Sequence, residues 1–441
     1  MNKQHTEERK TFSFDKSISL NIVHTEPDKY RLLEDVCHKS KKLINIGSNL
    51  SYSPLGFSRD SLSINIKKFN RVLEFDKEDK IITVEAGITL IELLNFTLKY
   101  NLWIPQIPGY PTITIGGAVA ANSHGKSCSI HGTIRNSIKS ILLFHKKHGW
   151  MKLSENENKE IFDLTIGGIG LTGTIVSVTF KLLKIKSKKF ITKKIAVNTV
   201  EECKNKILQE SKNSTFIYSW NRADNLKNFG RGIVYNNYMD ESSDDFKQLE
   251  VYYNNFKPFF IPLWNKYSIS FTNFIYLKLN NLAIPEKKED FLSVIFPFYK
   301  KENYFNFFGK KGFIESQLLI HESKFDSFIL EFKNLFKKYE PTITLFSLKN
   351  MSGQQKLLRF EDNKICITFD YVNNSKNQLF MSKIDSLYEK YEILPSIIKD
   401  SRLTKDIFNM SYKNSSVFIK KLRDFDKERI YQSEISRRLE I

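Results

Sequence analysis

A segment of small residues interrupted by glycine, Pro108–Gly132, constrains the fold more than any other part of this 441-residue chain. Glycine has no Cβ, so it reaches positive φ and lets a backbone approach a bulky ligand closely. The pair Gly116-Gly117 leads into Ala118–Ala121, which suits the first turn of a helix, and a helix N-terminus presents free N–H groups to a phosphate. The segment therefore predicts a cradle for a phosphate-bearing cofactor, with His124 and Lys126 just beyond it.

Two other segments have a related character. Gly47–Pro54 is a polar loop after the predicted strand Leu43–Ile46, and Gly167–Gly173 is a second glycine cluster before a strand of alternating pattern that starts near Val176. Neither glycine-rich segment has the spacing of a dinucleotide-binding fingerprint or of a P-loop. A nicotinamide or ATP site therefore has little support.

Composition narrows the function classes further. The formal net charge is +19, but the lysines are spread evenly and no nucleic-acid-binding motif appears, so we expect no nucleic-acid partner. The four cysteines form no CxxC pair, which predicts neither a metal site nor a dithiol and fits a reducing cytosol. Met1–Lys16 is polar and charged, so no signal peptide is expected.

No run of residues is long and apolar enough to predict a membrane span. The most lipophilic region is Val251–Ile284, which is rich in aromatic residues but interrupted by Asn, Lys and Pro. It fits either a patch at a membrane interface or a folded cap element, and the second is favoured slightly.

The pattern of predicted elements changes near residue 187. Before it, capping signals predict helices starting at Thr25 and at Thr89, and a hairpin over 138–153. After it, glycine becomes rare, and strands alternate with helices. We expect one sheet from three strands and two helices packed on it: Glu315–Ile320, Ile343–Leu348 and Ile365–Tyr371, with Lys324–Lys338 and Leu379–Tyr391.

Taken together, the three glycine-rich or polar blocks resemble those of the vanillyl-alcohol-oxidase superfamily, whose members have an FAD-binding domain of the PCMH type. Two further features are similar to the decaprenylphosphoryl-ribose oxidase branch of that superfamily. One is Ser123-His-Gly-Lys126, followed by His131-Gly132 and Asn136, and the other is Lys399-Asp-Ser-Arg402 with Ser436–Glu440 near the C-terminus.

The resemblance implies an α+β fold with a two-subdomain FAD-binding domain and an inserted substrate, or cap, domain built on an antiparallel sheet. We place the FAD-binding domain at 1–187, the substrate domain at 188–393 and a segment that returns to the FAD-binding domain at 394–441.

The resemblance also implies FAD as cofactor, held without a covalent bond. Leu50 stands where covalent relatives carry a histidine, and Tyr110 stands where others carry a cysteine. The residues that match the cofactor-binding positions are Gly47, Ser48, Asn49, Leu50, Ser51, Tyr52, Gly109, Thr114, Ile115, Gly116, Gly117, Ala121, Asn122, Ser123, His124, Gly168, Gly173, Ile175 and Lys399.

Three residues are candidates for catalysis by the same comparison. Lys399 matches a lysine beside the flavin, where an ammonium stabilises developing negative charge; the alternative is an ion pair with Asp400. Glu315 stands where relatives carry Gln or Glu, and could orient or deprotonate a hydroxyl or simply face solvent. His124 either faces the reacting centre or only supports the cofactor loop.

The expected substrate contacts are Lys126, Tyr299, Gln317, Lys364 and Cys366. Lys126 could meet an anionic group or be a surface lysine, and Cys366 could be an ordinary buried cysteine. Lys364 and Thr368 replace an Asn and an Asp of the resembled branch, which leaves the substrate open.

These features imply an FAD-dependent oxidoreductase that acts on a CH–OH group of a sugar-like substrate, with a polyprenyl-phosphoryl pentose or related cell-envelope glycan precursor as first choice. A separate NAD(P)H-dependent reductase would then consume the keto product. The alternatives are a soluble sugar-lactone or alditol oxidase and a flavin-binding partner subunit without turnover. The expected location is cytoplasmic, with peripheral contact to the inner face of the cell membrane left open.

Overall fold

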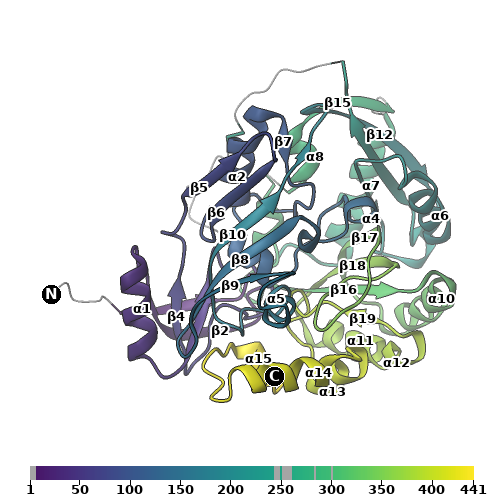
Figure 1. Cartoon of the computed structure of the whole chain (residues 1–441). Coiled ribbons are helices and arrows are strands. Elements are labelled where there is room, and N and C mark those ends of the chain that lie inside the picture. Colours follow the sequence, from purple (N-terminus) through teal and green to yellow (C-terminus); the bar gives the residue numbers. More distant parts are fainter. Residues whose placement is uncertain (1–5, 243–248, 251–260, 283–284, 299–300) are drawn as a thin grey trace.

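The computed structural model describes residues 6–242, 249–250, 261–282, 285–298 and 301–441, and four sheets with their helices make up the fold (Figure 1). Mixed helices and antiparallel sheets confirm the predicted α+β class. The domain limits predicted at residues 187 and 394 stay predictions. The first strand of the largest sheet begins at Lys189, just after the first limit, and the same sheet includes Leu394–Pro395 at the second.

Two sheets and their helices form the N-terminal half. The first has the order β1-β2-β4-β3 and the second β5-β6-β10-β8-β9. Their strands are β1 Glu7–Phe12, β2 Ser19–Thr25, β3 Leu43–Ile46, β4 Leu62–Asn65, β5 Val72–Asp76, β6 Ile81–Glu85, β8 Ile138–His145, β9 Gly149–Ser154 and β10 Thr174–Lys181. The helices are α1 Tyr30–Lys39, α2 Leu90–Thr97, α3 Ile115–Ala120, α4 Cys128–His131 and α5 Lys159–Thr165. One apolar core joins these elements and includes Leu93, Ile115 and Val178, none of them exposed.

The largest sheet has eight antiparallel strands in the order β15-β12-β14-β13-β17-β18-β16-β19. They are β12 Lys189–Val197, β13 Phe216–Asn221, β14 Gly232–Met239, β15 Glu286–Asp290, β16 Phe313–Ile320, β17 Ile343–Met351, β18 Lys364–Val372 and β19 Leu394–Pro395. A small pair, β7 Leu102–Trp103 with β11 Leu183–Lys184, completes the sheets.

Helices cover the two faces of this sheet differently. Its outer face packs against α6 Val200–Glu210, α10 Glu322–Tyr339, α11 Ser375–Asp385 and α12 Tyr388–Tyr391 around a second core. In that core Phe332 stacks on Phe369 with ring centroids 4.7 Å apart. Helix α7 (Lys266–Leu282) lies on the opposite face of β13 and β14, with α8 Phe291–Ile295 and α9 Asn303–Asn306 nearby in sequence.

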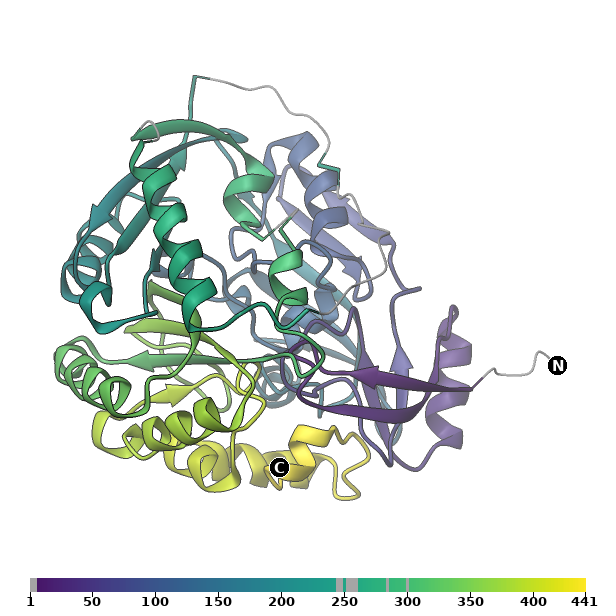
Figure 2. The ribbon, with the colours of Figure 1, turned by 180° about the vertical axis from the view of Figure 1, so that it is seen from behind.

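The C-terminal residues return to the N-terminal half. Helices α13 Lys405–Ser411, α14 Ser415–Phe425 and α15 Glu434–Arg438 lie along one side of the molecule, and the chain between the last two runs beside β3 (Figures 1 and 2). The Leu43 N–H donates to Ile430 O, and the Gln432 N–H donates to Leu43 O, both at 2.8 Å. The end of the chain therefore supports the strand that carries the first loop.

Most local predictions are confirmed. The capping box at Thr89, the hairpin of β8 and β9, and the three strands of one sheet with their helices are all present. The predicted helix start at Thr25 is wrong: Thr25 ends β2 and pairs in parallel with Ile64, and α1 begins at Tyr30. Strand pairing has overridden the local capping signal. Of the lipophilic region, residues 251–260 and 283–284 lie outside the described part.

Candidate active site

A cavity of about 970 Å³ lies where the three loops of the N-terminal half meet the eight-stranded sheet. Its size is at the upper end of the roughly 300–1,000 Å³ that small-molecule sites occupy. The loop after β3, the N-terminal end of α3 and the second glycine cluster line one part of it, and β13, β16, β17 and α7 line the other. The cavity therefore joins the predicted cofactor loops to the predicted substrate region.

The first two loops contact each other through Gly47. A Cβ at this position would lie 2.1 Å from Thr114 Oγ1, so only glycine fits. Thr114 is the N-cap of α3, and its Oγ1 accepts a hydrogen bond from the Gly117 N–H at 3.4 Å. Asn45 links β3 to the third block, because its Nδ2 donates to Gly173 O at 3.0 Å. The three blocks thus form one continuous backbone cradle.

The second glycine cluster wraps around the C-terminal end of α3. The Ile169 N–H donates to Ala120 O at 2.9 Å, and the Gly167 N–H donates to Val119 O at 3.0 Å. Gly167 has φ +76° and Gly170 has φ +79°, so this turn needs the left-handed backbone conformation that glycine adopts without a steric cost.

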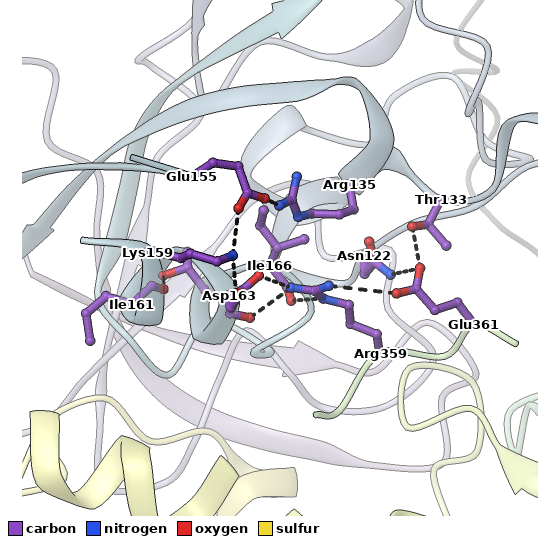
Figure 3. Close-up of polar contacts among 11 residues, drawn as sticks. Asn122, Thr133, Arg135, Glu155, Lys159, Ile161, Asp163, Ile166, Arg359 and Glu361 are labelled. Atoms are coloured by element: carbon purple, nitrogen blue, oxygen red, sulfur yellow. Dashed lines mark hydrogen bonds and ion pairs between the residues drawn. The ribbon is translucent and has the colours of Figure 1, made fainter. Parts of the chain in front are cut away.

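A buried ionic network holds this cradle from the other half of the molecule (Figure 3). Glu361, in the loop between β17 and β18, accepts hydrogen bonds from Asn122 Nδ2 at 3.1 Å and Thr133 Oγ1 at 2.7 Å. Arg359 of the same loop donates to Ile166 O at 3.2 Å and pairs with Asp163 at 2.9 Å. Asn122 itself has φ +45°, so the network fixes a strained backbone position next to the cavity.

Charged and hydroxyl groups gather at the inner wall of the cavity. Lys399 Nζ lies 3.1 Å from Glu315 Oε1 and 3.5 Å from the centre of the Tyr52 ring. Asp400 pairs instead with Arg402 at 2.9 Å, so the alternative partner predicted for Lys399 is not used.

Asp370 stands directly opposite Glu315, because the two residues are paired in the register of β16 and β18. Tyr304 Oη donates to Asp370 Oδ2 at 2.8 Å. Burial, and next the charge of Glu315, raises the pKa of Asp370 well above its ordinary value. The pair therefore favours one shared negative charge over two.

His124 and Tyr304 are also held in their neutral forms. Burial, followed by the charges of Lys349 and Lys399, lowers the pKa of His124 well below its ordinary value. Burial and the charge of Asp370 raise the pKa of Tyr304 well above its ordinary value. Both side chains can thus donate hydrogen bonds without adding charge to the site.

Most of the predicted residues line the cavity. They are Gly47, Ser48, Asn49, Leu50, Ser51, Tyr52, Gly109, Thr114, Gly116, Gly117, Ala121, Ser123, His124, Lys126, Gly173, Ile175, Glu315, Gln317 and Lys399. Buried Gln317 Oε1 has no hydrogen-bond partner among the described residues, while its Nε2 donates to Thr368 at 3.2 Å. An acceptor left open in this way fits a bound ligand that donates to it.

Five predicted residues are absent from the cavity wall, each for a visible reason. Ile115 belongs to the apolar core, and Asn122 turns to Glu361. At Gly168 a Cβ would lie 1.9 Å from Leu164 O, so this glycine serves local packing. Cys366 is fully buried in a core cluster, and Lys364 pairs with Asp362 at 3.1 Å.

Two further predicted contacts need separate mention. Lys126 lines the cavity, but its ammonium donates to Val294 O at 2.6 Å and Ile295 O at 2.7 Å. Burial lowers its pKa well below the ordinary value. Tyr299 lies outside the described residues.

Sequence reasoning missed Tyr304 and Lys349, which line the cavity, and Asp370, which contacts Tyr304 from the wall behind. Alternation along the predicted strand Ile365–Tyr371 places Asp370 on the same face as Thr368, which does line it. That signal was available for Asp370, whereas Tyr304 lies in a short helix without a pattern of its own. Within the described residues no group of His, Cys, Asp or Glu side chains could hold a metal ion.

Comparison with known proteins agrees with this geometry. Residues 22–153 match the FAD binding domain family. These residues contain the first two blocks of the cradle, which line the cavity. FAD is therefore the cofactor of this chain.

Individual relatives give a finer comparison. The chain is 24% identical to decaprenylphosphoryl-beta-D-ribose oxidase of Mycolicibacterium smegmatis over 90% of this chain and 88% of that protein. It is 27% identical to the mitochondrial L-galactono-1,4-lactone dehydrogenase of Brassica oleracea and 29% identical to L-gulonolactone oxidase of Mus musculus. Those two alignments span 33% and 32% of the relatives and 45% and 32% of this chain. The chain is thus an FAD-dependent oxidoreductase related to sugar oxidases and lactone dehydrogenases.

The ionic network at Glu361 leads to a first prediction. Glu361→Ala leaves buried Asn122 Nδ2 and Thr133 Oγ1 without their acceptor and removes one of the two carboxylates near Arg359, so we expect the free energy of unfolding to fall by about 2–4 kcal/mol and FAD to bind more weakly. Chemical denaturation of the FAD-free protein and fluorescence titration with FAD measure the two effects. The control is Glu160→Ala, which removes a surface pair with Lys421 and should change stability by less than about 1 kcal/mol. Equal effects of the two substitutions would contradict this role.

The raised pKa of Asp370 leads to a second prediction. Between the ordinary aspartate pKa and the raised one, the folded protein holds one proton more than the unfolded chain, so this residue makes stability fall as pH rises. Asp370→Asn removes that slope. The unfolding free energy of the variant, relative to the native protein, should therefore rise with pH by up to about 1.4 kcal/mol per pH unit within that window.

Denaturation curves of the FAD-free proteins between pH 5 and pH 8 test this slope. Asp28→Asn, at an exposed position, is the matched control and should keep a constant difference from the native protein. A difference for Asp370→Asn that stays flat over the whole range would rule out a protonated Asp370.

Proposed function

We propose that the protein oxidises a CH–OH group of a sugar-like substrate, and that this substrate is a polyprenyl-phosphoryl pentose or a related glycan precursor. The observation that supports the reaction is the pairing of Glu315 with Lys399 at the inner wall of the cavity, 3.1 Å apart and next to the cofactor loops.

Each residue of that wall has a distinct part in the proposed chemistry. FAD, when bound, supplies the hydride acceptor. The Glu315 carboxylate accepts the hydroxyl proton of the substrate, because oxidation of CH–OH releases one proton with the hydride. Neutral Asp370 keeps a second negative charge away from that carboxylate, and the ammonium of Lys399 stabilises negative charge that develops nearby.

The residues that would hold FAD are the Gly47–Tyr52 loop, the start of α3 and the turn at Gly170–Gly173. Gly47 lets the first loop pack against Thr114 and Gly116 lets α3 pack against Ala86 and Ile66, so these segments can form one wall of backbone groups. His124 would offer a neutral imidazole at the junction of cofactor and substrate.

The charge of the cavity supports an anionic substrate. Apart from Lys126, whose ammonium binds two carbonyl groups, five lysines line it against two acidic residues: Lys194, Lys287, Lys301, Lys349 and Lys399 against Glu289 and Glu315. A phosphodiester fits this balance better than a neutral lactone or alditol does. The full-length relative is named for a decaprenylphosphoryl ribose, which agrees with this choice. A soluble sugar-lactone or alditol oxidase is the second candidate, since shorter matches connect the chain to lactone enzymes.

Two further parts of the proposal follow from this chemistry. The keto product needs a separate NAD(P)H-dependent reductase if the pathway is to restore a hydroxyl group. A flavin-binding subunit without turnover is disfavoured, because Glu315, Lys399 and His124 all reach the cavity. A cytoplasmic location stays a prediction.

Non-covalent attachment is the third prediction. Leu50 and Tyr110 line the cavity but offer no histidine or cysteine to the flavin at the positions that covalent relatives use. Precipitation of the holoenzyme with acid should leave a colourless pellet and all the FAD in the supernatant. A yellow pellet would show a covalent bond that these two residues do not explain.

The fourth prediction tests the reaction and its substrate. Under anaerobic conditions a polyprenyl-phosphoryl pentose should bleach the flavin absorbance of the holoenzyme, and free lactones and alditols should not. Glu315→Gln keeps the shape of the side chain but cannot take a proton, so bleaching should slow by about 10²–10⁴-fold with the FAD spectrum unchanged. Asp28→Asn is the control for an exposed carboxylate.

The outcomes separate the candidates. Bleaching by free lactones or alditols alone would favour the second candidate over the first. No bleaching by any of these compounds would favour the subunit without turnover, and full-rate bleaching in Glu315→Gln would remove Glu315 as the base.

A further inference from the structure

Helix α7 exposes its apolar side chains to solvent. Its exposed large hydrophobic residues are Tyr267 (83%), Phe271 (67%), Phe274 (53%), Ile275 (37%) and Leu279 (63%). Spacings of three and four residues place them on one stripe of the helix. Ile261 and Leu263, just before the helix, are exposed as well and extend this apolar surface.

The inner side of α7 combines apolar and polar contacts: Ile269, Asn273 and Leu277 are buried, and Leu277 packs with Ile233 and Tyr235 of β14. Ser270 Oγ donates to Asp224 Oδ2 at 2.8 Å, and Asn273 Nδ2 donates to Asp224 Oδ1 at 2.9 Å. Asp224 is itself buried and paired with Arg222 at 2.7 Å. The hydroxyls of Tyr276 and Tyr235 share a hydrogen bond of 2.5 Å.

An ordinary surface helix turns its only apolar stripe to the core. Helix α7 is held on β13 and β14 by Leu277 and Tyr276 and on the loop between them by Asp224, and it carries a further apolar stripe on the side that faces solvent. Among the described residues nothing covers the stripe. Figure 2 shows α7 as the green helix at the surface, on the side opposite to the view of Figure 1. Exposed apolar surface of this extent marks a contact with a partner or a membrane.

The charges of this segment select the kind of partner. Residues 261–282 carry two lysines, Lys266 and Lys278, and no acidic residue. The chain as a whole has a net charge of +19. Aromatic and aliphatic side chains flanked by lysine are typical of helices that lie in the interface of an anionic bilayer. A second copy of this chain, equally basic, would be repelled at the same surface.

We propose that residues 261–265 and the exposed stripe of α7 form a docking surface that inserts into the headgroup region of an anionic membrane. No helix among the described residues is long and apolar enough to cross a bilayer. The proposal goes beyond the oxidation reaction and does not depend on the identity of the substrate.

The docking surface is continuous with the cavity. Ile269, Thr272, Asn273, Tyr276 and Asn280 of the same helix line the cavity wall. One helix thus contacts the membrane on one side and the proposed substrate on the other. A substrate anchored in the bilayer could reach the reacting groups without leaving the membrane completely.

The fifth prediction concerns binding to vesicles. The holoenzyme should sediment with vesicles that contain phosphatidylglycerol and much less with vesicles of phosphatidylcholine alone, and high salt should weaken binding. The double variant Phe271→Ser/Phe274→Ser should lose at least about tenfold in partitioning, because two exposed phenyl rings no longer enter the lipid. Leu330→Ser/Leu379→Ser is the matched control, with exposures of 62% and 49% on α10 and α11. It should bind like the native protein.

A second measurement locates the contact. All four native cysteines are buried, so an environment-sensitive dye can be attached selectively to Leu279→Cys or to the control Leu330→Cys. Vesicles should shift the emission of the first dye to shorter wavelength and leave the second unchanged. The flavin spectrum and thermal unfolding of each variant show that the fold is retained.

Three outcomes would overturn the proposal. They are equal binding of the phenylalanine variant and the native protein, no binding to phosphatidylglycerol vesicles, and equal dye shifts at both positions. Loss of a dimer in the phenylalanine variant, without vesicle binding by the native protein, would assign the surface to a second copy instead. None of these results would affect the flavin-bleaching experiment, so the two proposals can fail separately.

Discussion

The close contact between Gly47 and Thr114 is the constraint on which the rest of the site depends. Only hydrogen at the Cα of residue 47 lets the first loop lie against the cap of α3, since a Cβ would be 2.1 Å from Thr114 Oγ1. Because the second glycine cluster in turn binds the end of α3, all three blocks share one small helix. The chain ends and the loop at Glu361 then hold this assembly from both sides. A cofactor site built mostly from backbone needs such support, because it has few side chains that could adjust to a shift.

The wall of the cavity that carries Glu315 and Lys399 depends on the register of the strands. Glu315 faces Asp370 because β16 and β18 pair at these positions, and a slip of one residue in either strand would place the two carboxyl groups on opposite faces of the sheet. Helices α10 and α11, packed behind β16 and β18, stabilise that register through a core of stacked phenyl rings. The outer core that stabilises the sheet therefore also fixes the positions of Glu315 and Asp370. Lys399 reaches the pair from the loop after β19 and lies over the Tyr52 ring.

The sequence predicted the cofactor cradle well because its information is local. Glycines, caps and short strands lie next to one another in the chain, so the blocks around Gly47, Gly116 and Gly170 could be identified one by one. The substrate wall depends instead on which distant residues meet. Lys364 and Cys366 lie on β18, on the same face as Thr368, which lines the cavity. They lie at the start of the strand, beyond the cavity, and only the three-dimensional structure shows this. Tyr304 comes from a short helix without periodicity, and the strand pairing of Thr25 overrode a valid capping signal.

Helix α7 shows how a fold can combine two environments in one element. Its inner side is held by the packing of Leu277 on the sheet and by bonds to Asp224, a buried carboxylate that pairs with Arg222. That leaves the apolar stripe available for another surface. The same face that bonds Asp224 also lines a cavity whose lysines outnumber its acidic residues. An amphiphile with an anionic head and an apolar tail would meet both environments in the right order, the tail along the stripe and the head inside the cavity. Because Leu277 and the bonds to Asp224 together hold α7 on the sheet, the apolar stripe on its other side is available for a membrane.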